Sequence, residues 1–172
     1  MVKVEIRNAE KLLRLLKELP QDVVSDRKGG VAAKAVRTGA RPLFNEVRRN
    51  LQASIDKDGG DSTGLLVKNL KLRRRKANFK GEHFTIGVGN KRYPKRNGET
   101  YVDKRGKVRN ALMRGATTKL NGARLEYGTS RQSAVPWLRP ALAAKAEQTI
   151  HAITGDLGKR LDKLAEKYLK GK

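Results

Sequence analysis

The chain of 172 residues contains no cysteine, which excludes disulfide bonds and thiolate metal sites. It also contains no run of about eighteen apolar residues, the length that a membrane-spanning helix needs. Its N-terminus carries no apolar segment typical of a secretory signal. Because a chain of this length can bury a core without cross-links, we expect a soluble protein of one domain, spanning residues 1–172.

Groups that perform catalysis are also scarce. The two histidines, His83 and His151, have no cluster of acidic neighbours in the sequence, whereas a zinc site needs three or four grouped ligands. Three aspartates lie close together between residues 56 and 61, but the turn lacks the terminal glutamate of a calcium loop. No serine lies in a nucleophile-elbow motif. We predict that the protein is not an enzyme and holds neither a metal nor a cofactor.

Acidic residues are few compared with basic ones. Forty Lys and Arg face seventeen Asp and Glu, for a net charge of +23, and residues 65–131 alone hold nineteen basic and four acidic residues, a net of +15. Such a density requires a polyanion, an acidic protein surface or counterions nearby, although a solvated basic face is the simplest alternative. The candidate contact residues are Arg73, Arg74, Arg75, Lys76, Lys91, Arg92, Lys95 and Arg96.

The first third of the chain predicts a short strand and two helices. Apolar residues alternate from Val2 to Ile6, as in an edge strand, and leucines then recur at helical spacing until Pro20 ends the element. A second helix is expected over residues 31–55. Pro42 lies within it and should kink it or divide it into two pieces.

The middle of the chain predicts strands. A strand is expected from Leu65 onward, with a basic outer half, and a return strand over 83–89 that places Phe84, Ile86 and Val88 on one face. Residues 90–120 have few apolar anchors and predict an extended basic loop that orders against a neighbour. Within this loop, the stretch around 103–106 is typical of the turn of a small hairpin.

The C-terminal helix has the most regular pattern in the sequence. From Leu138 to Tyr168, apolar residues advance by three or four positions, which is the spacing of one helix face. Some thirty residues at 1.5 Å each make a helix about 45 Å long. We expect its first half to pack against the sheet and the N-terminal helices, and part of its apolar stripe to pack on other subunits.

The segment from Leu125 to Leu142 contains the only tryptophan and three structural signals. Residues 124–127 alternate like a short strand, Gly128 permits a turn with positive φ, and Pro140 fits the first turn of the following helix. We expect Trp137 to be wedged where sheet and helix meet. The segment carries no catalytic groups, and its predicted fold anchors are Glu126, Tyr127, Gly128, Thr129, Pro136, Trp137, Leu138, Arg139 and Pro140.

This segment resembles the signature of the small tail-completion, or head–tail joining, proteins of long-tailed phages such as the lambdoid ones. The matching residues are the Glu-Tyr-Gly-Thr-Ser turn at 126–130 and the Pro-Trp-Leu-Arg-Pro-Ala-Leu stretch at 136–142, and an Asp-Ser-Thr-Gly-Leu turn lies at the matching place, 61–65. The resemblance covers nearly the whole length, with an enlarged loop at 91–115 as a departure. It implies an α+β fold in which an antiparallel β-meander packs against two N-terminal helices and one long C-terminal helix.

The resemblance also implies a function. Copies of the chain would assemble as a ring, six-fold like a tail tube, at the head-proximal end of the tail, and would help to join tail and capsid. The implied partners are neck, tail-terminator or tail-tube proteins, with genomic DNA in the channel, and the location is the virion, or the host cytoplasm during assembly. The alternative is a freestanding basic nucleic-acid-binding protein, which the charge favours. Against it, aromatic residues make up only 5% of the chain and no known reading motif is visible.

Overall fold

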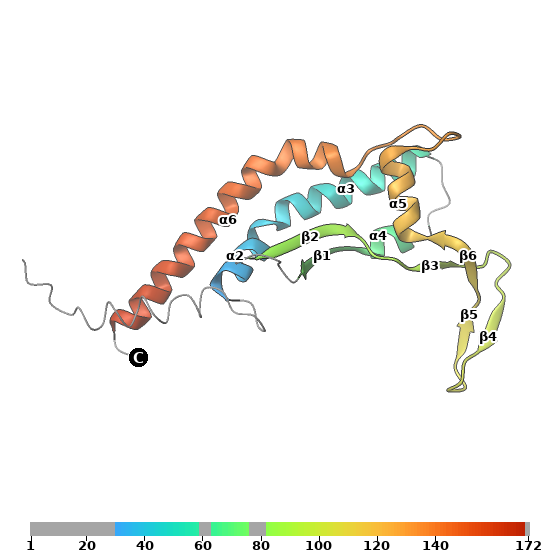
Figure 1. Ribbon diagram of the computed structural model, residues 1–172, viewed down its shortest axis with the longest axis horizontal. Coiled ribbons are helices and arrows are strands. Elements are labelled where there is room, and N and C mark those ends of the chain that lie inside the picture. The colour runs from blue at the N-terminus through green and yellow to red at the C-terminus, as the bar shows by residue number, and fades with distance from the viewer. Residues whose placement is uncertain (1–29, 59–62, 76–81, 171–172) are drawn as a thin grey trace, which may run out of the picture. The chain divides into compact units, whose positions relative to one another are not determined.

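A computed structural model describes residues 30–58, 63–75 and 82–170 (Figure 1). The predicted N-terminal strand and leucine-rich helix, the connection after the first long strand and Lys76 lie outside these residues. The described residues form five helices, α2 (Val31–Gly39), α3 (Arg41–Asp58), α4 (Leu65–Lys68), α5 (Thr118–Tyr127) and α6 (Leu138–Leu169). Their six strands are β1 (Leu70–Arg75), β2 (His83–Val88), β3 (Arg92–Pro94), β4 (Thr100–Val102), β5 (Val108–Asn110) and β6 (Leu112–Thr117). The predicted α+β class is therefore confirmed.

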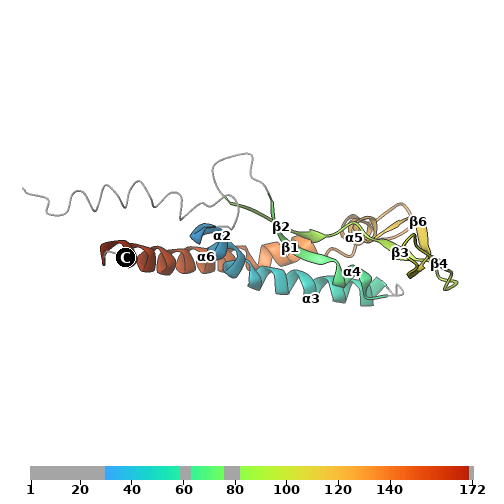
Figure 2. The ribbon, with the colours of Figure 1, turned by 90° about the horizontal axis from the view of Figure 1, so that it is seen from below.

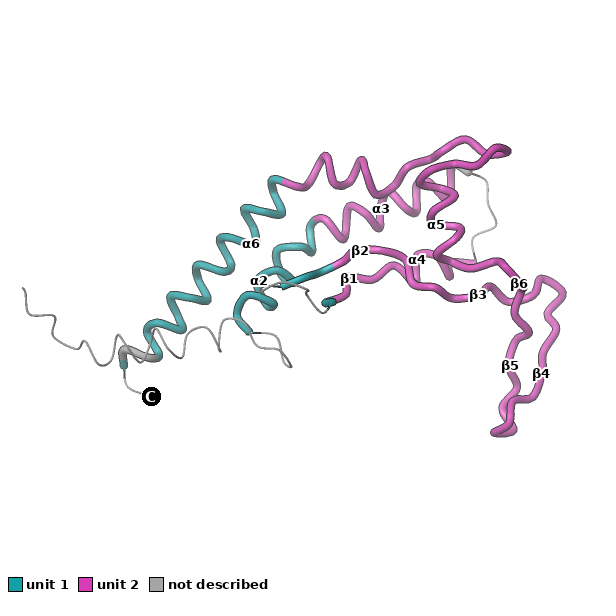
Figure 3. Tube along the Cα trace, in the orientation of Figure 1, with its two compact units in different colours: residues 1–42, 74–84, 147–172 teal, residues 43–73, 85–146 magenta. Residues whose placement is uncertain are grey.

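The chain divides into two compact units (Figure 3). Unit 1 takes its described residues from 1–42, 74–84 and 147–172, and unit 2 from 43–73 and 85–146. The single domain expected over residues 1–172 stays a prediction.

The hydrophobic core of unit 2 is built around α3. Val47, Leu51 and Ile55 recur every fourth residue and are 0%, 0% and 6% exposed, so one face of this helix is buried along three turns. The same core cluster includes residues from α4, β1, α5 and the start of α6, namely Leu66, Leu70, Leu125, Trp137 and Ala141. Side chains from four other elements thus meet on the buried face of α3.

The predicted effect of Pro42 is confirmed as a division into two helices. The first piece, α2, ends at Gly39, and α3 begins at Arg41, which places Pro42 in the first turn of α3. A proline at that position loses no hydrogen bond, because the first N–H groups of a helix have no acceptor within the helix. Proline is therefore tolerated there and marks the start of the second piece.

Unit 1 contains a close contact between two helices. Gly39, at the end of α2, is buried, and a Cβ atom added to it would lie 2.6 Å from the backbone nitrogen of Ile153 on α6 and closer still to the Ile153 Cγ1 atom. In the same unit, Arg74 on β1 forms a bidentate ion pair with the buried carboxylate of Glu82, at 2.6 and 2.7 Å.

The strands form three pairs, β1–β2, β3–β6 and β4–β5. The backbone N–H of Gly89 donates to the carbonyl oxygen of Asn69 at 2.9 Å, so the end of β2 lies beside the start of β1, as an antiparallel pair requires. The return strand over 83–89 is confirmed, as β2 over His83–Val88. The prediction of a strand from Leu65 was partly wrong, because Leu65–Lys68 is a helical turn and the strand begins at Leu70.

Residues 91–117, which we call the arm, lie within the basic loop predicted at about 90–120. The small hairpin predicted inside that loop is confirmed as the pair β4–β5, whereas the prediction of a loop for the rest was wrong, because β3 pairs with β6. Antiparallel pairing joins Arg92 to Thr117 at the base and Val102 to Val108 near the tip, and residues 95–99 bulge opposite Ala111. The predicted turn at 103–106 closes the distal pair. Figure 2 shows β3 and β6 leading from α5 toward β4, all within unit 2.

The prediction of a strand over residues 124–127 was also wrong. These residues form the last turn of α5, which begins after Thr117, whose hydroxyl oxygen accepts the N–H of Leu120 at 3.2 Å. Gly128 ends this helix with a φ of 74°. The long C-terminal helix is confirmed, as α6 over Leu138–Leu169, with Pro140 in its first turn.

Candidate functional site

The connection between α5 and α6, residues 126–140, is called the corner here, and Glu126 organises it. Its buried carboxylate accepts the backbone N–H groups of Trp137 and Leu138 through Oε2, both at 2.8 Å, and that of Arg139 through Oε1 at 3.1 Å. The first N–H groups of a helix have no acceptor within it. Glu126 supplies that acceptor and places a negative charge at the positive end of the α6 dipole.

The ionised form of Glu126 is favoured. Burial acts to raise the pKa of this carboxyl, but the backbone hydrogen bonds from α6 and the one from Arg139 Nε, at 3.0 Å, outweigh it, so the pKa lies below its ordinary value of 4.5. Arg139 also donates from Nη2 to the carbonyl oxygen of Glu126 at 2.8 Å, and its guanidinium lies 5.4 Å from the ring centre of Tyr127. Tyr127 is 70% exposed. The last turn of α5 and the first turn of α6 are therefore joined by one carboxylate and one guanidinium.

Gly128 has the positive φ that the sequence predicted. A Cβ atom there would lie 2.9 Å from both the Ala134 nitrogen and the Gln132 carbonyl oxygen, so a side chain is excluded by space as well as by φ. The backbones of Thr129 and Gln132 then pair with each other, and the Thr129 hydroxyl accepts the N–H of Arg131 at 3.2 Å. The turn expected at this point is thus held by its own backbone.

Trp137 is 4% exposed and lies where α5, β2 and the start of α6 meet. Its Nε1 donates to the carbonyl oxygen of Gly122 on α5 at 2.9 Å. Gly122 leaves room for the indole, since a Cβ atom on it would lie 3.6 Å from Trp137 Cζ2 and 3.3 Å from Val88 Cγ2. Of the remaining predicted anchors, Leu138 packs against the core and Pro136 is exposed.

The base of the arm is fixed to α5 by Thr118. This residue is fully buried, and its hydroxyl donates to the carbonyl oxygen of Gly89 at 2.5 Å and accepts the N–H of Lys91 at 3.0 Å. Its backbone N–H donates to the carbonyl oxygen of Lys91 at 2.8 Å. The phenol of Tyr93 on β3, whose pKa is raised by burial, also bonds to Asn121 on α5. The arm therefore leaves the core from a fixed position.

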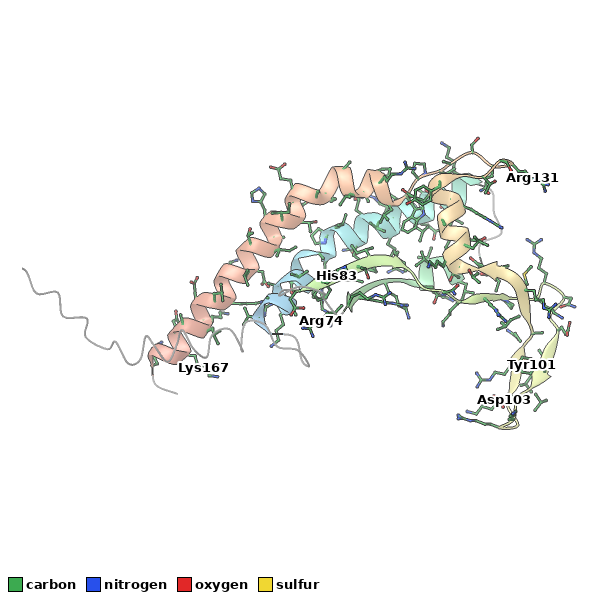
Figure 4. All side chains as sticks on the ribbon, in the orientation of Figure 1. Arg74, His83, Tyr101, Asp103, Arg131 and Lys167 are labelled. Carbon is green, nitrogen blue, oxygen red and sulfur yellow. The ribbon has the colours of Figure 1, made fainter. Side chains whose placement is uncertain are left out.

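The distal part of the arm is exposed on both faces. Every residue of β4 and β5 is exposed, including Tyr101 (50%), Val102 (65%) and Val108 (69%). Figure 4 shows Tyr101 and Asp103 at the far end of the arm from the helices of unit 2. A strand pair buries one face when it belongs to a core, so this pair presents its whole surface to solvent or to a partner.

The basic residues predicted from sequence are divided between the units. Arg74 and Arg75 belong to unit 1, where Arg74 pairs with Glu82. The others that the structure describes belong to unit 2 and are exposed, namely Arg73 on β1, Lys91 before β3, Arg92 on β3, and Lys95 and Arg96 in the bulge of the arm. Sequence reasoning omitted the cations at the tip of the arm, Lys104, Arg105 and Lys107, although the predicted turn places them together.

The described residues hold no group of three metal-ligating side chains. His83 lies on β2 and His151 on α6, where His151 has Glu147 3.8 Å away. A shallow surface hollow of about 600 Å³ lies against α3 and is lined mainly by polar side chains, including Arg48, Arg49 and Asp56. Within the same described residues, no helix is both long and apolar enough to cross a membrane.

Comparisons with protein-family models, with curated proteins and with solved structures found no match for this chain.

Proposed function

We propose that this protein is a structural component of a tailed-phage virion, a head–tail joining protein that assembles as a ring at the head-proximal end of the tail. The signature at 126–142 suggests this role, and in the structure its residues fix the direction in which α6 leaves α5. The observation that carries the proposal is the exposed apolar stripe on α6. A ring requires such a contact surface between identical subunits.

The apolar stripe of α6 does not coincide with its buried side. Among the α6 residues whose side chains the structure describes, only Ala141 and Thr149 are buried. Neither belongs to the stripe, in which Leu142 is 53% exposed and Ile150 60% exposed. The other stripe residues whose side chains the structure describes are half-buried, namely Leu138, Ala146, Ile153, Leu157, Leu161 and Leu164. Fully burying an exposed Leu or Ile side chain is worth about 1.5–3 kcal/mol, so a neighbouring subunit would gain most by covering Leu142 and Ile150.

The arm supplies a second surface for assembly. Heterologous contacts between identical subunits close a ring when the rotation permits, and a six-fold ring would match the symmetry of a tail tube. The arm projects exposed strands with unpaired edges, to which another chain can bind. Neck, tail-terminator and tail-tube proteins are the proposed partners, and the basic residues of β1 and the arm would face acidic surfaces on them or DNA in the channel.

The test uses tails assembled without the protein. Wild-type protein added to such tails should restore their joining to heads, whereas a Leu142→Glu, Ile150→Glu variant should restore it at least tenfold less. The matched control, Ala144→Glu with His151→Glu, adds the same two carboxylates to exposed positions away from the stripe and should behave as wild type. If the stripe variant keeps its melting temperature and restores joining fully, the stripe is not a contact surface and the proposal fails.

The charge of +23 favours a second candidate, a freestanding basic nucleic-acid-binding protein of ribosomal or nucleoid type. The same experiment separates the two. A freestanding protein would bind nucleic acid in a salt-dependent way but would not restore the joining of heads to tails.

A further inference from the structure

The arm carries a strong excess of positive charge. Residues 91–117 hold nine Lys and Arg and two acidic residues, a net of +7. The cations lie on both strands and at the tip, which carries Lys104, Arg105 and Lys107. No carboxylate of the described residues forms an ion pair with these three side chains.

Both carboxylates of the arm bind groups within the arm. Asp103 accepts the backbone N–H groups of Arg105 and Lys107 through Oδ1, at 2.8 and 3.0 Å, and pairs with Arg109 Nε through Oδ2 at 2.9 Å. Glu99 pairs with Lys95 at 2.7 Å. The hydrogen bonds from Lys107 and Arg109 lower the pKa of Asp103, and those from Lys95 and Asn97 lower the pKa of Glu99. Both carboxylates therefore stay ionised, and each is paired with a cation of the arm itself. The net charge that the arm presents to a partner is therefore positive.

The tip is held in one conformation. Gly106 has a φ of 74°, its N–H donates to the Asp103 carbonyl oxygen at 2.9 Å, and the Asp103 N–H donates to the Lys107 carbonyl oxygen at the same distance. Antiparallel pairing then continues from Val102 and Val108. A pre-formed hairpin loses little conformational freedom on binding, which favours a role in recognition over that of a flexible tether.

The dimensions of the distal pair match a DNA groove. Two strands are about 4.8 Å apart, and five residues of strand extend about 16 Å. The major groove of B-form DNA is about 12 Å wide and 8.5 Å deep, and it admits a two-stranded ribbon. The ribbon of β4 and β5, from Thr100 to the tip and back to Asn110, is therefore long enough to reach the groove floor while cations nearer its base meet the phosphates.

We propose that the β4–β5 ribbon binds double-stranded DNA by entering its major groove. Lys104, Arg105 and Lys107 contact phosphates and base edges there, and the exposed cross-strand pair Val102 and Val108 supplies apolar contact with thymine methyl groups. An acidic protein surface is the competing partner. Duplex DNA is favoured because the tip cations, which pair with no carboxylate of the described residues, lie on a narrow ribbon that is exposed on both faces. This inference does not rest on the head–tail role.

The experiment measures binding of the full chain to a fluorescent duplex of twenty base pairs across a range of KCl concentrations. The test variant is Lys104→Ala, Arg105→Ala, Lys107→Ala, and the matched control is Lys159→Ala, Lys163→Ala, Lys167→Ala, which removes three exposed cations from α6. We expect the tip variant to bind at least tenfold more weakly at 100 mM KCl. Its log–log salt slope should be shallower by about 1–3, since each tip cation that contacts a phosphate contributes about 0.9 and one that contacts only a base edge contributes less. The control should stay within about twofold of wild type.

Three results would overturn the proposal. Wild-type protein that fails to bind duplex at 50 mM KCl would exclude it. Equal weakening in both variants would show that binding follows total charge and not the ribbon. Displacement of duplex by poly-glutamate of matched charge as readily as by unlabelled duplex would favour an acidic protein partner. Entry into the major groove is tested separately, because it predicts that wild-type protein protects guanine N7 from methylation and that the tip variant does not.

Discussion

At the scale of single residues, Glu126 has the most specific role in the structure. Its carboxylate lies eleven residues before Trp137 in the chain and yet accepts three N–H groups at the start of α6. The sequence marked Glu126 as a fold anchor, but this role could not be derived from it, because the contact depends on how two helices meet. The positive φ of Gly128 and the burial of Trp137 could be predicted, since glycine readily adopts positive φ and tryptophan is usually largely buried.

The first prediction concerns Glu126→Gln. At pH 7 this change should lower the free energy of unfolding by about 1–3 kcal/mol, because the amide binds the N–H groups of α6 less strongly than the carboxylate does. The pKa of Glu126 is lowered in the folded state, so its contribution is complete above its ordinary value of 4.5 and is lost as the pH falls through the folded value. Denaturant unfolding between pH 3 and 7 should therefore show the difference in unfolding free energy between wild type and variant narrowing as the pH falls below 4.5. A difference that stays constant with pH would contradict this role.

At the scale of elements, regular apolar patterns over six or more residues were predictable, and a four-residue alternation was not. The apolar spacing of α6 and the alternation of β2 gave correct elements, since each covers many residues. The short alternation at 124–127 suggested a strand, although Thr117 and Gly128 are the start and stop signals of a helix and enclose α5. The distal hairpin of the arm, β4 and β5, was predicted from its turn. The strands at the base of the arm, β3 and β6, were not predicted, because this part of the sequence has few apolar residues and no regular alternation.

The second prediction concerns the contact between α2 and α6. Gly39→Ala replaces glycine with a better helix former, a change that by itself favours a helix by about 1 kcal/mol. In this structure the added methyl group would overlap the backbone of Ile153, so the two helices must separate. We expect a net loss of about 1–3 kcal/mol in the free energy of unfolding, which thermal melting would detect. The control, Gly155→Ala on α6, meets no atom within 4 Å and should leave stability equal or higher. Unchanged melting of Gly39→Ala would show that this contact is not formed.

At the scale of the whole molecule, the large net positive charge opposes assembly of the free protein with itself. Copies that each carry +23 repel one another, so a ring of them requires counter-charge from a partner or from salt. In the proposed ring, the exposed apolar stripe of α6 would supply attraction between copies, and the basic arm would bind acidic groups that offset the repulsion. The free protein should therefore remain monomeric at low salt and assemble only at its target.

The most direct test of this account is electron microscopy of the protein bound to purified phage tails. We predict that the protein appears only at the head-proximal end of each tail, and that end-on averages show a ring with the six-fold symmetry of the tube. Protein that remains unbound, or that decorates the tube along its length, would contradict the proposed role.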